Sequence, residues 1–380
     1  MIYLDNAATT FPKPLTVRNA SAFMLHHGAN PGRSGHEPSM RASEEIFHAR
    51  EAAAELFHAP SPVSVIFTLN CTSAINMVMK GILKSGDHVI VSELEHNAVM
   101  RPLNALKDKG ITYSVAKVYP EDNDSTVNAF RRAINANTRM IFCTQASNVW
   151  GIRLPVERLC ALAHEYGLLM AVDAAQSAGI VPIDLSDSKF DFLCIPGHKG
   201  LYGPMGTGML IVSSDTVPKP LIEGGTGSNS QSFEQPEDLP DRLESGTPNV
   251  SGIAGLRAGI GFVSKRKPQM IAKHEYQLMQ RLYSGLKDNK KVRLYFSEPK
   301  EPYYLPLLSF NIKDMDSETA ARELNRSGIA VRAGLQCSPM AHRMAGTEEI
   351  GAVRASPSVF STASDIDRLL SAVNRISRVK

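Results

Sequence analysis

The sequence predicts an α/β protein, with a large, mostly parallel-sheet domain followed by a smaller α+β C-terminal domain. Short apolar runs alternate with amphipathic stretches from Val63 to Leu210, which is typical of a parallel sheet covered by helices. Residues 224–248 are rich in Gly, Ser and Pro and indicate a long surface loop. After this loop, helical and strand-like patterns mix on a smaller scale. A chain of 380 residues is long enough for two such domains.

The predicted elements follow in chain order. Six apolar runs are expected to be the strands of the large domain: 63–68, 88–92, 139–145, 168–173, 190–195 and 208–212. Amphipathic segments at 73–86 and 156–167 are expected to form helices between them. Beyond the loop, helices are expected over 251–267, 274–288, 317–328 and 364–377. Strand-like runs at 305–313 and 329–334 complete the smaller domain.

The composition is that of an ordinary globular protein, with 43% hydrophobic and 21% charged residues. Because the net charge is only +3, neither nucleic acid nor a membrane surface is expected as the main partner. No apolar run approaches the roughly 20 residues of a membrane span, and the first residues lack the layout of a signal peptide. Five cysteines without a CxxC pair argue against a disulfide framework and a zinc site, and predict a reducing, cytoplasmic setting.

One cysteine differs from the others in its surroundings. Four of them lie in or beside apolar runs, as buried cysteines do: Cys71, Cys143, Cys160 and Cys194. Cys337 lies instead in the turn-like segment RAGLQCSPMAH, residues 332–342. These neighbours predict an accessible thiol, and the positive charge of Arg332 favours its ionised form.

Two polar residues follow the ends of neighbouring apolar runs. Asp173 closes LLMAVD, and Lys199 follows FDFLCI after a turn at Pro196 and Gly197. Ligands bind at the carboxyl ends of strands in open sheets, and an acid that closes so apolar a strand needs a partner. The two residues form either a plain ion pair or the pair that pyridoxal phosphate requires. In that pair the lysine binds the cofactor covalently and the carboxylate keeps the pyridine nitrogen protonated. Taken alone, Lys199 is more often explained as a solvated loop lysine.

Such a cofactor also needs an anion site and a stacking partner for its ring. Thr72 and Ser73 follow a strand and open a helix, where free amides and the helix dipole favour a phosphate. His96 follows the strand-like run HVIVS and offers an imidazole for stacking. On their own, these residues are explained as well by a simple N-cap and a structural histidine.

Taken together, these motifs resemble the class V aminotransferase family, in particular its cysteine desulfurase and selenocysteine lyase branch. Nine segments carry the resemblance in the family's order: YLDNAATT (3–10), CTSAIN (71–76), EHNAV (95–99), SNVWG (147–151), VDAAQS (172–177), GHKGLYGPMGTG (197–208), ESGTPN (244–249), RAGLQC (332–337) and VRAS (353–356). The resemblance implies a pyridoxal-phosphate fold of type I in three parts. Residues 1–15 would be an N-terminal segment near the active site, 16–250 a large cofactor-binding domain, and 251–380 a small domain carrying the Cys337 loop.

The resemblance also implies roles for residues. Lys199 would bind pyridoxal 5'-phosphate covalently, Asp173 would pair with its ring nitrogen, and His96 would stack on the ring. Further cofactor contacts are implied for Gln176 and Asn148 at the ring hydroxyl, for Thr72 and His198 at the phosphate, and for Thr247 at the phosphate of the other subunit of a homodimer. Arg354, with Arg332 as a weaker candidate, would bind the substrate carboxylate through its guanidinium fork.

Two positions depart from the family's pattern. Pro196 stands where the family often has a serine, so that either the cofactor is held less tightly or Ser73 compensates for the lost hydroxyl. Cys71 stands where the family often has a threonine.

By the same resemblance, the expected activity is that of a cysteine desulfurase. Lys199 would take the α-proton of L-cysteine, and Cys337 would attack the substrate sulfur, which yields L-alanine and an enzyme persulfide. His96 is the candidate for handling the proton of the substrate thiol. The alternatives are a selenocysteine lyase acting on L-selenocysteine, a class V aminotransferase or β-lyase for another amino acid, and an inactive scaffold. The sequence leaves open the persulfide acceptor, a protein or a small thiol, and its destination in iron–sulfur cluster assembly, modified RNA or selenium metabolism.

Overall fold

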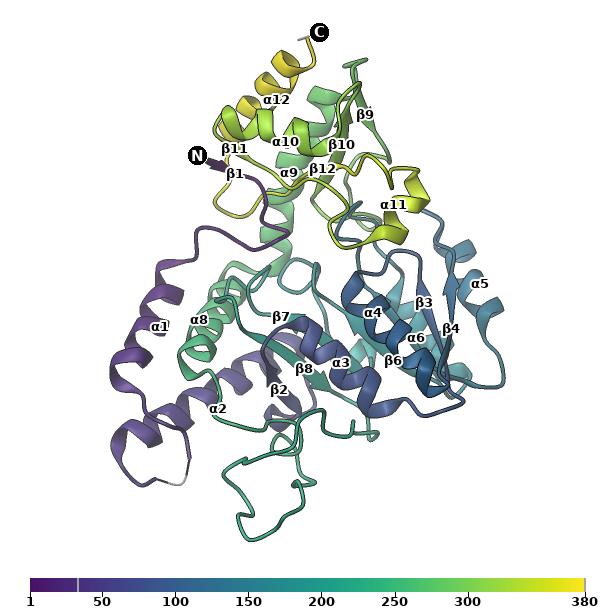
Figure 1. The fold of residues 1–380 in the computed structure, drawn as a ribbon. Helices are drawn as coiled ribbons and strands as arrows, with labels where there is room; N and C mark the ends of the chain where they lie inside the picture. Colours follow the sequence, from purple (N-terminus) through teal and green to yellow (C-terminus); the bar gives the residue numbers. More distant parts are fainter. Residues whose placement is uncertain (33, 379–380) are drawn as a thin grey trace.

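A seven-stranded sheet is the centre of the computed structural model, which describes residues 1–32 and 34–378 (Figure 1). The strands lie in the order β2-β8-β7-β6-β5-β3-β4. Strand β8 is antiparallel to both of its neighbours, and the other pairs are parallel. The bounds are β2 (Val65–Thr68), β3 (His88–Ser92), β4 (Thr112–Ala116), β5 (Thr138–Thr144), β6 (Leu169–Asp173), β7 (Phe192–Pro196) and β8 (Gly208–Val212). The predicted mostly parallel α/β sheet is therefore confirmed.

Helices cover both faces of this sheet, because successive side chains of a buried strand point to opposite sides. Ile141 and Cys143 of β5 pack in one core cluster with α2, α5, α6 and α8, whereas Met140 and Phe142 pack in the other with α3 and α4. The helices of this part are α1 (Leu15–His27), α2 (Glu37–Phe57), α3 (Cys71–Ile82), α4 (Asn97–Leu106), α5 (Asn123–Ala133), α6 (Val156–Glu165), α7 (Leu185–Ser188) and α8 (Val250–Arg266), with 3-10 turns at Pro62–Ser64 and Lys107–Lys109. Among the described residues, no helix is both long and apolar enough to cross a bilayer.

The smaller part is built on a three-stranded antiparallel sheet in the order β12-β10-β9. Its core includes Leu282, Phe310 and Leu369, all fully buried. The elements are α9 (Pro268–Leu286), β9 (Val292–Leu294), β10 (Leu308–Ile312), α10 (Ser317–Arg326), α11 (Pro339–Ala345), β12 (Val353–Ala355) and α12 (Ala363–Ile376). This part lies above the end of the large sheet in Figure 1, and it supplies one wall of the site described below.

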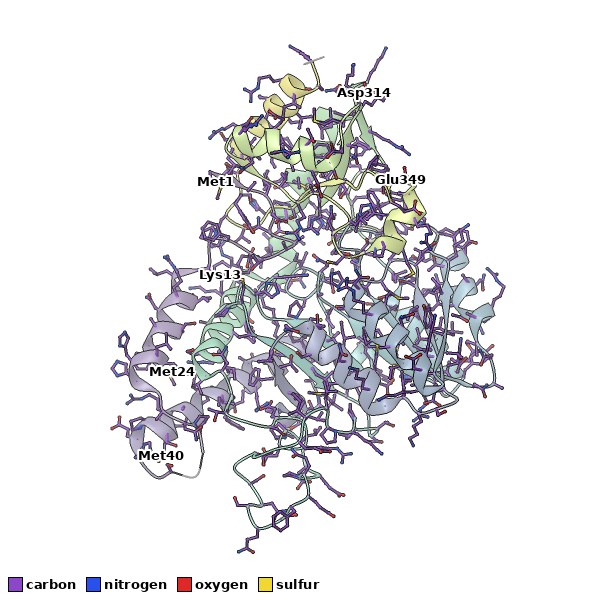
Figure 2. All side chains as sticks on the ribbon, viewed as in Figure 1. Met1, Lys13, Met24, Met40, Asp314 and Glu349 are labelled. Atoms are coloured by element: carbon purple, nitrogen blue, oxygen red, sulfur yellow. The ribbon has the colours of Figure 1, made fainter. Side chains whose placement is uncertain are left out.

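The first residues of the chain connect the two parts. Strand β1 (Ile2–Tyr3) pairs in parallel with β11 (Ile329–Ala330), and Ile2 belongs to the core of the smaller part. Farther along, the hydroxyls of Thr9 and Thr10 and the ammonium of Lys13 all donate to the carbonyl of His198. Figure 2 labels Lys13 at the level where the two parts meet. The segment therefore ties the smaller part to the loop that carries Lys199.

Some elements differ from the sequence expectations. The patterns gave no indication of α1, α2 or the edge strand β4, in which only Ala116 is buried. Residues 224–248 form neither helix nor strand and project from the large part as a loop (Figure 1).

Helix α8 packs on α1 and α2 through Ile253 and Ala254, whereas α9 packs in the smaller core. We therefore propose that the large domain ends near Lys267 rather than at residue 250.

Trp150, the one tryptophan of the sequence, joins the large part to α11. Its Nε1 donates to the carbonyl of Ala341 at 2.7 Å, and its ring centroid lies 5.3 Å from that of His342. The His342 ring is buried, with Nδ1 2.8 Å from Oγ1 of Thr347. Burial lowers the pKa of His342 to about 4, so the ring is neutral at neutral pH.

We predict that His342 makes the free energy of unfolding depend on pH. The unfolded chain binds this proton near pH 6.5, but the folded chain binds it only near pH 4. The contribution of the neutral ring is thus fully present above about pH 6.5 and is lost as the pH falls towards 4. The urea midpoint of the cofactor-free protein, followed by Trp150 fluorescence, should fall between about pH 7 and pH 5. His342→Asn should show a smaller fall, and an equal fall in both proteins would contradict the assignment.

Candidate active site

A cavity of about 280 Å³ lies where the sheet, the smaller part and the N-terminal segment meet. Strands β5, β6 and β7 all end at this cavity, as expected for ligand sites in open parallel sheets. Its walls hold ten of the twelve residues singled out from the sequence: Thr72, His96, Asn148, Asp173, Gln176, His198, Lys199, Arg332, Cys337 and Arg354. The other two, Ser73 and Thr247, do not line this cavity.

Lys199 presents a half-buried amine to the cavity without an ion-pair partner among residues 1–32 and 34–378. Desolvation lowers the pKa of this amine, and the Asp173 carboxylate opposes the shift. Because a neutral amine is the nucleophilic form, the site favours the reactive state of Lys199. The preceding carbonyl, that of His198, is fixed by donors from the N-terminal segment, which restrains the position of Lys199.

Asp173 is buried at the end of β6, and one of its carboxylate oxygens is free to bind a ligand in the cavity. Its Oδ1 accepts from the amide of Ala175 at 2.9 Å and from the thiol of Cys71 at 3.4 Å. Its Oδ2 has no partner among the described residues. Burial, followed by the charge of Asp173, raises the pKa of Cys71 well above its usual value, so Cys71 stays a thiol. Although Cys71 departs from the family's threonine, it remains a hydrogen-bond donor to Asp173.

His96 is the N-cap of α4, which determines the position of its ring proton. The ring Nδ1 accepts from the amide of Ala98 at 3.0 Å. An amide can only donate, so the proton of the neutral imidazole lies on Nε2. Burial lowers the pKa of His96, although Asp173 opposes the shift. The ring is therefore a flat, neutral group that donates from Nε2, and it can accept a second proton only if the cap at Nδ1 is broken.

Unpartnered donors gather at the N-terminus of α3. Asn70 caps the helix by accepting from the amide of Ser73 at 2.9 Å, while the amides of Cys71 and Thr72 have no partner among the described residues. His198 adds Nδ1, a buried ring nitrogen that also lacks a partner in the described part of the chain and donates in the tautomer that carries its proton there. Burial lowers the pKa of His198 to about 4. Together with the helix dipole, these donors form an anion site.

The structure does not bring Ser73 to this anion site. Its Oγ donates to Oδ1 of Asn70 at 3.2 Å, because one step along the helix from Thr72 turns the side chain away. Ser73 lines a second cavity of about 230 Å³ on the other side of the α3 N-terminus. The interpretation that Ser73 replaces the hydroxyl lost at Pro196 is therefore unsupported. Thr247 lines the same second cavity and does not reach the first cavity of its own chain.

Arg354 is the buried cation of the site, with 2% of its surface exposed. Its Nη2 pairs with Oδ1 of Asp5 at 3.0 Å, and its Nη1 donates to the carbonyl of Asn148 at 2.6 Å. The Nε is buried without a partner among the described residues, so the guanidinium keeps unpaired N–H groups for a bound anion such as a carboxylate. Arg332 lines the same wall but is exposed. Asp5 was missed by sequence reasoning, although an acid directly after the strand-like run IYL (residues 2–4) was a signal for a buried ion pair.

Cys337 is exposed at the rim of the cavity, while the other four cysteines are buried. Its neighbours Gln336 and Ser338 are buried and hydrogen-bonded to the carboxamide of Asn148. Gln176 donates from Nε2 to the carbonyl of Ala7 at 3.1 Å. No pattern in the sequence had indicated functions for Gln336 and Ser338, because both act through a residue almost 190 positions away.

The donor set fits pyridoxal 5'-phosphate. The cavity offers an unpaired amine at Lys199, a free carboxylate oxygen at Asp173 and a flat imidazole at His96. The unpartnered donors at the α3 N-terminus and His198 suit the phosphate. Each group thus matches a part of the cofactor.

Comparisons with known proteins agree with this geometry. The Aminotransferase class-V family model matches residues 2–369. A probable cysteine desulfurase from Methanothermobacter thermautotrophicus is 34% identical over 97% of this chain and 92% of the relative. A cysteine desulfurase from Escherichia coli is 32% identical over 100% of this chain and 94% of the relative. Some relatives are longer: the chain spans 55% of a probable cysteine desulfurase from Mycolicibacterium paratuberculosis, which is 31% identical.

Solved structures of cysteine desulfurases are also similar to this chain. The apo structure of a cysteine desulfurase from Thermococcus onnurineus superposes with a TM-score of 0.91 at 28% identity, over 99% of this chain and 94% of that chain. The S-sulfonic acid form of a cysteine desulfurase from Escherichia coli gives a TM-score of 0.87 at 30% identity, over 98% and 94% of the two chains. The chain therefore belongs to the class-V aminotransferase family, and the relatives described above are cysteine desulfurases or probable cysteine desulfurases.

Proposed function

We propose that this protein is a pyridoxal-phosphate-dependent cysteine desulfurase that converts L-cysteine to L-alanine and leaves a persulfide on Cys337. The observation that carries the proposal is that one cavity holds both a desolvated lysine and the one exposed cysteine in the described part of the chain. A lyase or aminotransferase for another amino acid has no use for a thiol at this position.

The residues around the cavity have separate tasks in holding the cofactor. Lys199 would bind it covalently, Asp173 would pair with the ring nitrogen and His96 would stack on the ring. Thr72, the α3 amides and His198 would hold the phosphate, while Gln176 and Asn148 would contact the ring hydroxyl. When bound, pyridoxal 5'-phosphate supplies a protonated ring that withdraws the electrons released at the substrate Cα.

Lys199 is the residue that accepts the proton of the substrate Cα. Its lowered pKa leaves part of the amine neutral, and a neutral amine can accept the proton of the substrate Cα. The Asp173 carboxylate would pair with the ring nitrogen and so help to maintain the protonated ring. His96, which donates from Nε2, is placed to hydrogen-bond the substrate sulfur rather than to take a proton at that atom.

Cys337 is the residue that accepts the substrate sulfur. The thiolate Sγ attacks the substrate sulfur, so a sulfur–sulfur bond forms as the substrate Cβ–S bond breaks. The electron pair of the broken bond stays with Cβ, which takes up a proton, and the products are L-alanine and the Cys337 persulfide. One cysteine and one enzyme thiol thus balance one alanine and one enzyme persulfide without an external oxidant. Arg354 lines the cavity and orients the substrate by binding its carboxylate through unpaired N–H groups of the guanidinium.

The assembly and the destination of the sulfur are also proposals. We propose a homodimer in which Thr247 reaches the phosphate of the other subunit. The second cavity supports this, since its rim exposes apolar side chains such as Leu69 and Ile222, 65% and 67% exposed. The exposed Cys337 persulfide would pass to an acceptor protein or a small thiol, in the cytoplasm, for a process such as iron–sulfur cluster assembly.

The experiment that tests the function is incubation of the cofactor-loaded protein with L-cysteine and a thiol reductant. Sulfide and alanine should appear in equal amounts, and the protein should sediment at about twice the 41.4 kDa of one chain. Release of pyruvate, or turnover restricted to L-selenocysteine, would refute the proposal in favour of a β-lyase or a selenocysteine lyase.

A further inference from the structure

The backbone of the Cys337 loop has an unfavourable conformation. Gln336 and Cys337 both lie in the left-handed region, with φ angles of 49° and 59°. This region costs non-glycine residues free energy, and two consecutive residues there need support from their surroundings. Because the Cys337 side chain is exposed, packing of the thiol itself does not supply that support.

One carboxamide holds both neighbours of the cysteine. Asn148 donates from Nδ2 to the carbonyl of Gln336 at 2.7 Å and accepts at Oδ1 from the hydroxyl of Ser338 at 2.6 Å. Ser338 is fully buried and Gln336 is 8% exposed, whereas Asn148 is half-buried. We call this pair of bonds the Asn148–Ser338 clamp.

Ser338 forms this bond in place of the one expected from its position. It is the N-cap residue of α11, where a serine normally accepts a hydrogen bond from an amide of the first turn. No such bond exists at α11; the one side-chain bond of Ser338 among the described residues is its donation to Oδ1 of Asn148. The helix therefore begins without its side-chain cap, and the hydroxyl serves the loop.

The clamp connects to the rest of the site at two points. The carbonyl of Cys337 accepts from the amide of Asn97 at 2.7 Å, and Asn97 directly follows His96. The carbonyl of Asn148 accepts from Arg354 at 2.6 Å. The loop is thus bonded to the element that carries His96 and to the residue that holds Arg354.

We propose that Ser338 and Asn148 are positioning residues for Cys337. The clamp keeps the loop in its left-handed conformation, and this conformation holds the thiol at the rim of the cavity. The consequence for sulfur transfer rests on the proposed function, whereas the effect on the loop does not.

Ser338→Ala tests the clamp directly, since it removes the hydroxyl and leaves every other atom of the loop. In the full-length, cofactor-loaded protein, hydrogen–deuterium exchange should be at least tenfold faster in peptides covering residues 334–340 and 95–100. With L-cysteine, kcat should fall at least tenfold, while KM and the absorption spectrum of the cofactor stay within about twofold of the original. Ser338→Thr, which restores a hydroxyl, should recover most of both effects.

Two further variants keep the test decisive. Ser64→Ala is the matched control, because it also removes a buried serine hydroxyl that donates a hydrogen bond, in this case to the backbone carbonyl of Ser61 at 2.6 Å; it should change neither exchange nor kcat. Asn148→Asp keeps the acceptor for Ser338 but removes the donor to Gln336, and it should also speed exchange at 334–340. Exchange in Ser338→Ala equal to that of the original protein would overturn the clamp. If the original protein proves inactive on L-cysteine, the proposed function fails while the exchange data still decide the clamp.

Discussion

Replacing Cys337 by serine should reduce the production of sulfide and alanine from L-cysteine at least a hundredfold, which corresponds to about 2.7 kcal/mol of barrier. A hydroxyl stays protonated near neutral pH, so serine cannot supply the nucleophile that attacks the substrate sulfur. The variant should still bind L-cysteine and change the absorption spectrum of the cofactor, because binding and removal of the α-proton precede sulfur transfer. Mass spectrometry should find a persulfide on the original protein and none on the variant.

The control for this change is Cys160→Ser. Cys160 is buried in α6, and burial raises the pKa of its thiol to about 12, so it takes no part in thiol chemistry. This variant should keep normal turnover. If Cys337→Ser also turned over L-cysteine at a near-normal rate, the persulfide mechanism would be wrong and a lyase or aminotransferase reaction would be favoured. L-Selenocysteine should still be cleaved by Cys337→Ser to some degree, since that bond breaks with less help.

Replacing Lys199 by alanine should abolish turnover altogether, with an expected loss of at least about a thousandfold, or ~4 kcal/mol. The variant lacks both the covalent attachment of the cofactor and the base that accepts the α-proton. Borohydride treatment of the loaded original protein should fix the cofactor on Lys199, as detected in a single labelled peptide. The variant should show no labelled peptide and should lose the cofactor on gel filtration.

Lys80→Ala, at an exposed position of α3, is the matched control and should be labelled and active like the original protein. The outcome that would contradict the assignment is a label on Lys13. Burial lowers the pKa of that lysine to about 8, which makes it the other reactive amine nearby. Lys13 already donates to Oγ1 of Thr10 at 2.7 Å and to the carbonyl of His198 at 2.8 Å, and it does not line the cavity. We therefore expect no label there.

The large sheet could be predicted from the sequence because its strands are buried on both faces. Runs such as HVIVS and LLMAVD have continuously apolar centres, and the strands that they form are buried in the structure. Asp173 and Lys199 stand out for the same reason, since a polar residue directly after such a run lies at the edge where ligands bind. Strand β4 escaped prediction because it lies at the edge of the sheet, where polar residues such as Thr112 are tolerated.

The finer parts of the site could not be predicted, because they depend on contacts between distant residues. Asn148 and Ser338 are 190 positions apart in the sequence, and Asp5 and Arg354 are separated by 349. No local pattern encodes such pairs. Ser73 shows that neighbours in the sequence can also belong to different sites. It lies next to Thr72, but the turn of the helix directs the two side chains to different cavities.

The pairing of β1 with β11 has a consequence for how the chain folds during synthesis. Ile2 finds its partner Ile329 only after roughly 330 further residues have been made. At a translation rate of about 5–20 residues per second, this takes roughly 15 to 65 seconds. The sheet of the large domain, which ends with β8 at Val212, can form on the ribosome well before then. Throughout this interval the apolar residues of β1 remain unburied on the nascent chain, so they are a natural target for ribosome-associated chaperones.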